Sequence, residues 1–345
     1  MNLNRLGTVS WSDSQLLYHA QPRLGREGLN LLSPGSPYVC IGYFQDVAQE
    51  VDIELCQEQG IPIFRREVGG GAVYLDGDQL FYQLIIHRDN PLVPAGWEAF
   101  YRRFLQAPIA AYQTLGIPAE YRPVNDIVAR GRKVSGNGAA EIGDYLVLVG
   151  NLIVDFDYEN MARVLKVPDE KFRDKLYQTL RDNLSTIRRE IGVAPPREEL
   201  WDLLAEKFTE VLGPMTTVTE VDDEWRAEVE NLGQEMLTDE WLYKRRGRPR
   251  DRKVTIRSGV EVRQRMYKAP GGLIRAIAEL QEGHLGAVSF SGDFFFYPAE
   301  KLIELEAALN GVKPEETEQT IASFYEQHEI ESPGVTPGDL AHVLL

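Results

Sequence analysis

The stretch "RREVGGGAVYLDGDQLFY", residues 65–82, places three consecutive glycines between two arginines and an alternating apolar run. Glycine tolerates backbone conformations that other residues avoid, and it lets a ligand approach the main chain. Gly69, Gly70 and Gly71 could therefore offer N–H groups to a phosphate beside the charges of Arg65 and Arg66. A wide turn between two strands is the structural alternative. The stretch is not a Walker loop, because no Gly-Lys-Ser/Thr follows the glycines. It is not a dinucleotide fingerprint either, because a strand follows instead of a helix.

A second glycine-rich segment, "NDIVARGRKVSGNGAAEIGDYLVLVGNLI", spans residues 125–153. Lys133 follows a glycine turn in it and precedes Ser135, Gly136 and Asn137. A lysine that alternates with apolar residues on a strand often faces solvent, but small neighbours here leave space for a bound molecule. A lysine ammonium in such a place could bind a carboxylate and an α-phosphate together and offset their mutual repulsion.

Composition narrows the class of protein. With 345 residues and 43% hydrophobic content, the chain is expected to form two soluble domains. It contains no apolar run of roughly 18 residues and no signal-peptide pattern at its N-terminus, so a cytoplasmic location is expected. Two separate cysteines and five scattered histidines argue against a zinc site or a disulfide framework. A formal net charge of -16 disfavours nucleic acid and favours a protein or small-molecule partner.

The first two-thirds of the chain predicts a mixed sheet flanked by helices, in the α+β class. Short β-rich runs separated by Gly and Pro begin at residues 38, 61, 72, 80, 125 and 144. Apolar residues recur at helical spacing over 97–105, and Pro108 predicts a break just beyond them. Further helices are expected at roughly 158–182, 196–213 and 222–237.

The basic segment "YKRRGRPRDRKV", residues 243–254, predicts an exposed linker. Its cations could be a solvated surface, or they could steer an acidic partner. It divides a domain at residues 1–243 from a domain at 254–345, with the linker itself at 244–253. Alternating strands in 254–267 and 284–298, followed by helices at 299–311 and 314–328, predict a small C-terminal α+β unit.

The two glycine-rich segments, in this order, resemble the lipoate–protein ligase A type within the biotin and lipoate ligase superfamily. The family pattern runs Arg-Arg-x-x-Gly-Gly-Gly-x-Val, then Asn-Asp, then Lys-x-Ser-Gly. The matching residues are Arg65, Arg66, Gly69, Gly70, Gly71, Val73, Asn125, Asp126, Lys133, Ser135 and Gly136. "YVCIGYFQDVAQEVD" and "GNLIVDFD" also resemble family strands, and "GDFFF" at 292–296, with the helix after it, resembles the ligases' small C-terminal accessory domain. The resemblance therefore implies a biotin/lipoate-ligase-like fold with such a domain.

The resemblance implies a two-step reaction. Lipoate or octanoate would react with ATP and Mg²⁺ to give acyl-AMP and pyrophosphate, and the acyl group would pass to a lysine of a carrier. The carrier would be a dehydrogenase-complex acyltransferase subunit, a glycine-cleavage H protein or a specialised lipoate-binding protein. Lys133 would be the catalytic residue, and Asp126 would orient it or hold the magnesium ion. The residues expected to bind ATP or the adenylate are Arg65, Arg66, Gly69, Gly70, Gly71, Ala72, Val73, Tyr74, Leu75, Asp76, Gln79, Asn125, Asp126, Ser135, Gly136, Asn137, Gly150 and Asn151.

The apolar residues on the strands around Val73 and Leu152 have two interpretations. They would line a tunnel for the dithiolane ring and its alkyl chain, or they belong to the core. The sequence leaves this choice open.

The sequence departs from the family pattern at both segments. Where the ligases usually carry His-Asp-x-Gly-Asn, this chain has Leu75 to Gln79, and where they carry Ser-Gly-Ser-Ala and His-His-Gly-Thr, it has residues 135–138 and 148–151. These changes fit an altered substrate or carrier preference, or weakened adenylation. A related group of octanoyltransferases uses a cysteine nucleophile. That interpretation is disfavoured because no cysteine follows Cys56, and burial of both thiols is expected. The alternatives left open are a lipoyl- or octanoyltransferase that ignores ATP and a non-catalytic relative that binds lipoyl domains.

Overall fold

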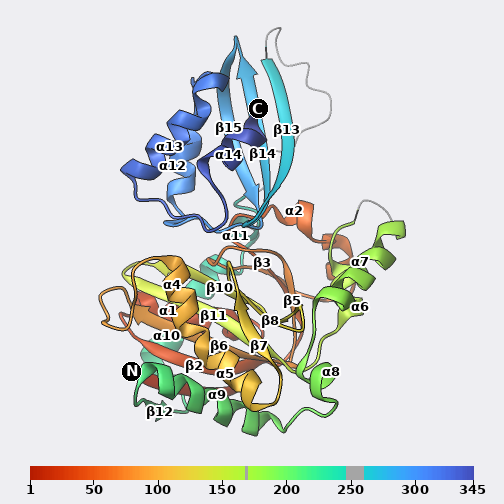
Figure 1. Cartoon of the computed structure of the whole chain (residues 1–345), viewed down its shortest axis with the longest axis vertical. Coiled ribbons are helices and arrows are strands. Elements are labelled where there is room, and N and C mark those ends of the chain that lie inside the picture. The colour runs from red at the N-terminus through yellow and green to blue at the C-terminus, as the bar shows by residue number, and fades with distance from the viewer. Residues whose placement is uncertain (168–169, 246–259) are drawn as a thin grey trace.

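The computed structural model describes residues 1–167, 170–245 and 260–345. Figure 1 shows a larger unit that contains the N-terminus and a smaller unit, built from the end of the chain, that sits on it. In these ranges no helix is long and apolar enough to cross a membrane.

A six-stranded mixed sheet forms the centre of the larger unit, in the order β10-β11-β6-β2-β1-β12. Strand β1 pairs in parallel with β2 and β12, whereas β6 runs antiparallel to β2 and β11. The central strand β6, QLFYQLIIH, is buried at every position except its last, which is the pattern of a strand covered on both faces. The bounds are β1 Asn2–Val9, β2 Gly28–Pro34, β6 Gln79–His87, β10 Asn137–Ile142, β11 Tyr145–Ile153 and β12 Thr216–Val218.

Helices cover both faces of this sheet. Alternate residues of a strand point to opposite faces, so Tyr82 packs toward α9, with its ring 5.3 Å from that of Phe208. Gln83 points the other way and donates to the Ser14 carbonyl of α1 at 2.7 Å. In Figure 1, α4 and α5 cover the near face with α9, while α1 packs with α10. The bounds are α1 Asp13–Arg23, α4 Trp97–Phe104, α5 Gln106–Thr114, α9 Arg197–Leu212 and α10 Asp223–Met236.

Two small sheets carry the segments singled out in the sequence. The first has the order β4-β3-β5, and residues 69–71 lie between β4 and β5. The second has the order β7-β8-β9, and Lys133 lies on β9. The bounds are β3 Tyr38–Ile41, β4 Ile63–Arg65, β5 Val73–Leu75, β7 Ala119–Arg122, β8 Asp126–Ala129 and β9 Arg132–Ser135. The remaining helices of this unit are α2 Val47–Glu50, α3 Ile53–Glu58, α6 Tyr158–Val164, α7 Glu170–Asn183, α8 Ile187–Ile191 and α11 Asp239–Leu242.

The smaller unit is a three-stranded antiparallel sheet with helices. Its strands lie in sequence order, β13-β14-β15, and helix α14 packs on β13 and β14 while α12 packs on β15. The bounds are β13 Val260–Ala269, β14 Gly272–Gln281, β15 His284–Gly292, α12 Lys301–Ala308, the 3₁₀ turn η1 Pro314–Glu316, α13 Thr317–Gln327 and α14 Pro337–Leu344.

The aromatic run that follows β15 anchors the two units to each other. Phe294 stacks on Phe44 of the larger unit with ring centroids 5.1 Å apart. Phe295 and Tyr297 join the main core of the larger unit, and the Tyr297 hydroxyl donates to the Ala139 carbonyl at 3.0 Å. Burial of large aromatic surfaces stabilises such contacts. The smaller unit is therefore held in one position beside the central sheet.

The predicted α+β class, with a mixed sheet flanked by helices and a small C-terminal α+β unit, is confirmed. The single helix expected at 158–182 is wrong, because α6 ends at Val164 and α7 begins at Glu170. The helix expected before Pro108 ends at Phe104, and α5 starts two residues later. Helices α1 and α14 and strand β14 were not predicted. Residues 246–253 of the expected linker, and the start of the strand expected at 254–267, lie outside the described residues, and the domain boundaries remain predictions.

Acidification is expected to destabilise the fold through His19 of α1. Burial lowers the pKa of His19 to about 4, although Glu67 nearby opposes this. Its Nε2 accepts from the Glu67 amide at 3.1 Å, so Nδ1 donates to the Gln15 carbonyl. Because the unfolded chain takes up the proton first as pH falls below about 6.5, stability is lost between that pH and about 4. Urea denaturation should show a loss of about 2 kcal/mol from pH 7 to pH 5.

The matched variants for this test are His19→Gln and His87→Gln. His19→Gln should flatten the pH dependence of the unfolding free energy over this range. His87 has a 36% exposed side chain, so His87→Gln should leave the slope close to that of the parent protein. An unchanged slope in His19→Gln would contradict the assignment.

Candidate active site

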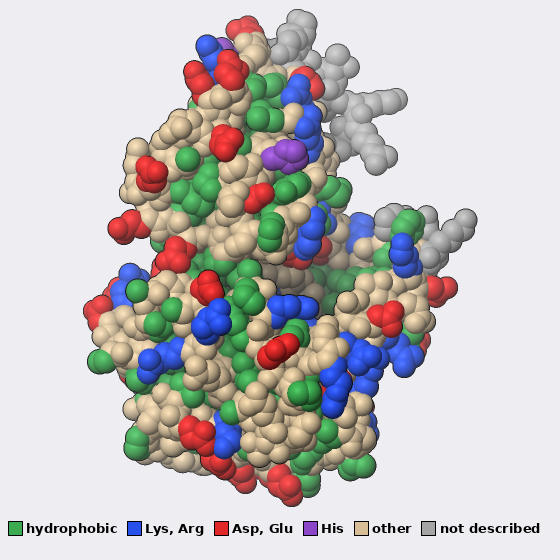
Figure 2. Space-filling view, viewed as in Figure 1, with side chains coloured by type: hydrophobic (Ala, Val, Ile, Leu, Met, Phe, Trp, Pro, Cys, Tyr) green, Lys and Arg blue, Asp and Glu red, His purple; other side chains and the backbone are tan. Residues whose placement is uncertain are grey.

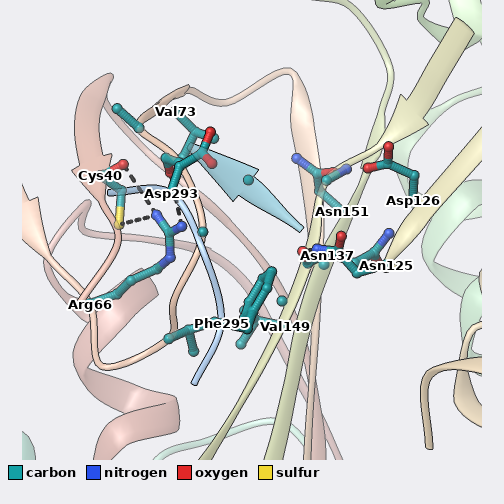
Figure 3. A pocket seen from close by; sticks show the side chains of 18 of the residues that line it. Cys40, Arg66, Val73, Asn125, Asp126, Asn137, Val149, Asn151, Asp293 and Phe295 are labelled. Carbon is teal, nitrogen blue, oxygen red and sulfur yellow. Dashed lines mark hydrogen bonds between the residues drawn. The ribbon is translucent and has the colours of Figure 1, made fainter. Parts of the chain in front are cut away.

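A cavity of about 390 Å³ lies between the central sheet, the two small sheets and the smaller unit. Figure 3 shows Asn125, Asp126, Asn137 and Asn151 on one side of it and Cys40, Arg66, Val73 and Asp293 on the other. The cavity therefore brings together the two glycine-rich segments, which are far apart in the sequence.

Most of the residues expected at the site line this cavity. They are Arg66, Gly70, Gly71, Ala72, Val73, Leu75, Asn125, Asp126, Lys133, Gly136, Asn137, Gly150 and Asn151. Six expected residues do not line it: Arg65, Gly69, Tyr74, Asp76, Gln79 and Ser135. For Tyr74 the reason is strand alternation, because Val73 and Leu75 on either side of it face the cavity.

The arginine pair of the first segment divides into two roles. Arg66 lines the cavity, and its guanidinium donates to the carbonyls of Gly69 at 2.8 Å and Gly71 at 2.9 Å. It also contacts Cys40, as the dashed lines in Figure 3 show. Arg66 therefore holds the glycine loop in shape from the cavity side.

Arg65 points away from the cavity and is fully buried. Its guanidinium donates to four backbone carbonyls, those of Gly42, Tyr43, Gln45 and Leu242, at 2.7–3.2 Å. The structure therefore does not place Arg65 at the cavity, since its guanidinium joins β4 to the turn after β3 and to α11, and a role of Arg65 in nucleotide binding stays a prediction.

Close packing or backbone conformation requires two of the loop glycines, Gly69 and Gly70. A Cβ on Gly69 would lie 2.7 Å from the Phe294 carbonyl oxygen, and one on Gly42 would lie 1.9 Å from the Gly70 carbonyl oxygen. Gly70 has a φ of +89°, and its N–H donates to the Phe294 carbonyl at 3.2 Å. One N–H of the expected phosphate nest is thus bonded to the smaller unit, and Gly70 and Gly71 present backbone to the cavity.

Lys133 forms an ion pair at the cavity wall. Its Nζ lies 2.7 Å from Oδ1 of Asp126, and Oδ2 of Asp126 accepts from Arg122 at 2.8 Å. Burial raises the pKa of Asp126, but the nearby Lys133 and Arg122 outweigh it and hold this pKa below its usual value. The carboxylate therefore stays ionised at neutral pH and orients the lysine ammonium.

A chain of amides fixes the loop after Lys133. Asn151 accepts from the Gly136 N–H at 2.8 Å and donates to Gln79 at 2.7 Å, and Gln79 donates to the Tyr74 carbonyl at 3.1 Å. Gln79 and Asn151 stand at positions where this chain departs from the family pattern. Gln79 supports Asn151 from behind, which explains why it is buried without lining the cavity.

The cavity has residues that sequence reasoning missed. One group lies at its buried end: Gln15, Tyr18, Cys40, Val68, Phe81 and Gln83. Another comes from the smaller unit: Lys268, Pro270, Gly271, Gly272, Asp293 and Phe295. Gly138 and Val149 complete the set. Of these, Val68, Phe81, Gly138 and Val149 lie in the two glycine-rich segments, and Cys40 and "GDFFF" lie in stretches that resemble the family, although none was expected at the site. Gln15, Tyr18 and residues 270–272 carried no such signal.

Both cysteines are buried, as expected. Cys40 does line the cavity, but burial raises the pKa of its thiol above the usual value, and contact with Arg66 offsets this only in part. A thiol in that state is a weak nucleophile at neutral pH.

The residues present do not fit a magnesium ion held by the protein alone. Both oxygens of Asp126 are engaged by cations, and Oδ1 of Asp293 accepts from the Leu273 N–H at 2.6 Å. Within the described ranges, no three His, Cys, Asp or Glu side chains come together as a metal site. Of the two roles open for Asp126, the geometry favours orienting Lys133.

Two curated relatives show the range of names among similar proteins. The octanoyltransferase LipM of Kyrpidia tusciae is 27% identical over 239 residues, which cover 63% of this chain and 87% of the relative. Lipoate-protein ligase A subunit 1 of Thermoplasma acidophilum is 30% identical over 216 residues, which cover 59% of this chain and 79% of the relative.

Three solved structures share the fold. A bipartite lipoate protein ligase from Thermoplasma acidophilum, described with its E2 lipoyl domain, has a TM-score of 0.62 and 24% identity, covering 74% of this chain and 100% of that one. A lipoate-protein ligase A bound with ATP has a TM-score of 0.59 and 24% sequence identity, and the match covers 71% of this chain and 98% of that one. LipL1 of P. falciparum in complex with lipoate has a TM-score of 0.70 and 16% sequence identity. This match covers 96% of this chain and 95% of that one, so the smaller unit is included in the similarity.

The family description "lipoyl protein ligase A/B catalytic domain" matches residues 11–209, a span that contains both glycine-rich segments and Lys133. The resemblance read from those segments is thereby confirmed. This chain belongs to the lipoyl protein ligase A/B catalytic domain family, the family of lipoate–protein ligases and octanoyltransferases.

Proposed function

We propose that this chain is an ATP-dependent lipoate–protein ligase that acts on lipoate or octanoate. The observation that carries the proposal is the Lys133–Asp126 ion pair, which presents an ammonium group to a cavity that also contains the glycine loop. An ammonium so placed stabilises the negative charge of a carboxylate and of an α-phosphate that approach each other. The ligases among the similar proteins, one of them described with ATP bound, support the same chemistry.

In the first step, a carboxylate oxygen of the acid attacks the α-phosphorus of ATP, and pyrophosphate leaves. In the second step, the amine of a carrier lysine attacks the acyl carbonyl, loses a proton, and AMP leaves. Lys133 would contact the acyl carboxyl and the α-phosphate in both steps, because the P–O bond that forms in the first step and the C–O bond that breaks in the second share one bridging oxygen. Any magnesium ion would arrive on the nucleotide phosphates, since the protein groups near the cavity are already paired.

The proposed acceptor is a lipoyl carrier domain. A similar structure is described with its E2 lipoyl domain, and this supports a carrier of that type. The buried end of the cavity, with Phe81 and Val68, would hold the alkyl chain and the dithiolane ring.

An octanoyltransferase that takes its acyl group from a carrier thioester is the second candidate, because LipM of Kyrpidia tusciae is among the relatives. The cysteine-dependent form of that reaction has little support here, since Cys40 is the cysteine that lines the cavity and burial raises the pKa of its thiol. A form that uses Lys133 alone needs no nucleotide.

Mass spectrometry of an apo lipoyl domain separates the two candidates. The protein is incubated with the domain and lipoate or octanoate, with and without MgATP, and in parallel with an octanoyl thioester of acyl carrier protein without nucleotide. A gain in mass that needs ATP and the free acid supports the ligase. A gain from the thioester alone, with none from ATP and free acid, would replace it with the transferase.

A further inference from the structure

Five arginines form an exposed surface beside the cavity. This arginine surface consists of Arg130 and Arg132 on the β8–β9 hairpin, Arg181 at the end of α7, and Arg188 and Arg189 on α8. Their side chains are exposed or half-exposed; that of Arg188, for example, is 58% accessible. Figure 2 shows Lys and Arg side chains gathered over this part of the larger unit.

Contacts among the β8–β9 hairpin, the end of α7 and α8 keep the arginine surface together. The Glu190 carboxylate, only 3% exposed, pairs with Arg130 and Arg132 from β9 and its turn. It also accepts from the Ser185 hydroxyl at 2.5 Å. Arg189 donates to the carbonyls of Arg181 and Leu184. These contacts therefore hold the β8–β9 hairpin, the end of α7 and α8 together, so that the five arginines share one surface.

The arginine surface is joined to Lys133 through the backbone. The Ser185 N–H donates to the Lys133 carbonyl at 2.8 Å, and Leu184 and Lys133 form a parallel β-bridge. Because side chains alternate along a strand, Arg132 and Lys133 point to opposite sides of β9. The same strand thus carries the ammonium that faces the cavity and a cation that faces solvent.

The acidic groups near these arginines cancel only part of their charge. Glu190 pairs with Arg130 and Arg132, and Asp155 pairs with Arg188 at 3.2 Å. With Asp182 these are three carboxylates against five arginines, which leaves a local balance of +2. The rest of the protein is strongly acidic, with a formal net charge of -16. An acidic partner would be repelled by most of the surface and attracted here.

We propose that the arginine surface docks an acidic carrier domain and so places its acceptor lysine at the Lys133 side of the cavity. The inference rests on the proposed function, since it names where the protein substrate of that reaction binds. The partner is identified by its chemistry: a folded domain with acidic side chains around the modified lysine. The charges that make the interaction are exposed, so added salt should screen them and weaken the binding of the carrier domain.

Direct binding tests the surface without any reaction. Binding of a purified apo E2 lipoyl domain with an acidic surface is measured by calorimetry, without nucleotide, at about 20 mM and about 300 mM salt. Arg181→Glu/Arg188→Glu is the test variant, because these two side chains are exposed and do not line the cavity. Arg226→Glu/Lys301→Glu makes the same change in net charge on α10 and α12, which lie on the opposite side of the view from α7 and α8 in Figure 1.

At low salt, the test variant should bind the lipoyl domain about tenfold more weakly than the parent protein, and the control variant within about twofold. At high salt, the difference should shrink to about twofold or less. Lipoate-dependent pyrophosphate release should be unchanged in both variants, because that step involves no carrier. The neutral pair Arg181→Gln/Arg188→Gln should give an intermediate loss of binding, which separates a charge effect from local misfolding.

Parent-like binding by the test variant, or an equal loss in the control variant, would overturn the proposal, as would parent protein that does not bind the domain. Failure of the proposed function is a different result, since it would abolish pyrophosphate release in the parent protein while leaving carrier binding measurable.

Discussion

Lys133→Ala is expected to reduce lipoyl transfer by about a thousandfold. Removing one preorganised electrostatic group from a site of this kind commonly costs a factor of 10² to 10³, and Lys133 is proposed to act in both half-reactions. The Lys133 side chain is held by its 2.7 Å pair with Asp126, so little reorganisation is needed when substrate binds. The measurements are pyrophosphate release for the first step and carrier mass for the second.

Lys133→Arg and Asp126→Asn are the informative companions. Arginine keeps the charge but changes its geometry, so activity should be only partly restored. Asp126→Asn keeps the shape of the side chain but removes the partner charge, and we expect about a tenfold fall in the first step. Lys207→Ala, on α9 and paired with Glu206 and Glu210, is the control and should be fully active. Lys133→Ala with more than a tenth of parental activity would contradict the proposed role.

Arg65→Met is expected to lower the free energy of unfolding by about 3 kcal/mol or more. The substitution keeps an apolar stem of similar length, but it leaves the carbonyls of Gly42, Tyr43, Gln45 and Leu242 without the donors that Arg65 supplies. A buried polar group that loses its partner costs roughly 1–3 kcal/mol, and here several lose theirs at once. Urea denaturation measures the loss.

Two comparisons separate this structural role from a role in nucleotide binding. Arg226→Met, at an exposed position on α10, should change stability by less than about 0.5 kcal/mol. Folded Arg65→Lys protein, assayed at low temperature, should keep the parental KM for ATP. A raised KM for ATP with unchanged stability would indicate that Arg65 binds the nucleotide, and would contradict the structural role proposed for it.

Much of the site could be predicted because its residues are consecutive or closely spaced. Gly70, Gly71, Asn125, Lys133 and Gly136 sit in short motifs whose residue types state their chemistry, and all of them line the cavity. The sequence is less informative about whether two adjacent residues of one motif both reach the cavity. Arg65 and Arg66 are adjacent, yet one faces the core and the other the cavity, because successive residues of an extended chain point in opposite directions.

Helix α1 shows what a pattern of hydrophobicity cannot reveal. Residues 14–22 are all buried, including Ser14, Gln15, His19 and Gln21, so the helix has no exposed polar face to mark its period. Its polar side chains are satisfied by distant partners, such as Tyr38 for Gln15 at 2.6 Å and Asn30 for Gln21 at 2.7 Å. Those partners are invisible in the sequence, and two cavity residues, Gln15 and Tyr18, were missed with the helix.

Residue types and their spacing were enough to predict the α+β class, the family, and the two segments that carry the charge and the glycines of the site. These are local properties, set by residue type and by spacing along the chain. The tertiary structure decided which of the expected residues reach the cavity, that Asp293 and Phe295 of the smaller unit complete it, and that Arg130 and Arg188 share one surface. Such groupings depend on contacts between segments more than fifty residues apart, where strand direction, burial and hydrogen-bond satisfaction, rather than spacing, determine which side chains meet.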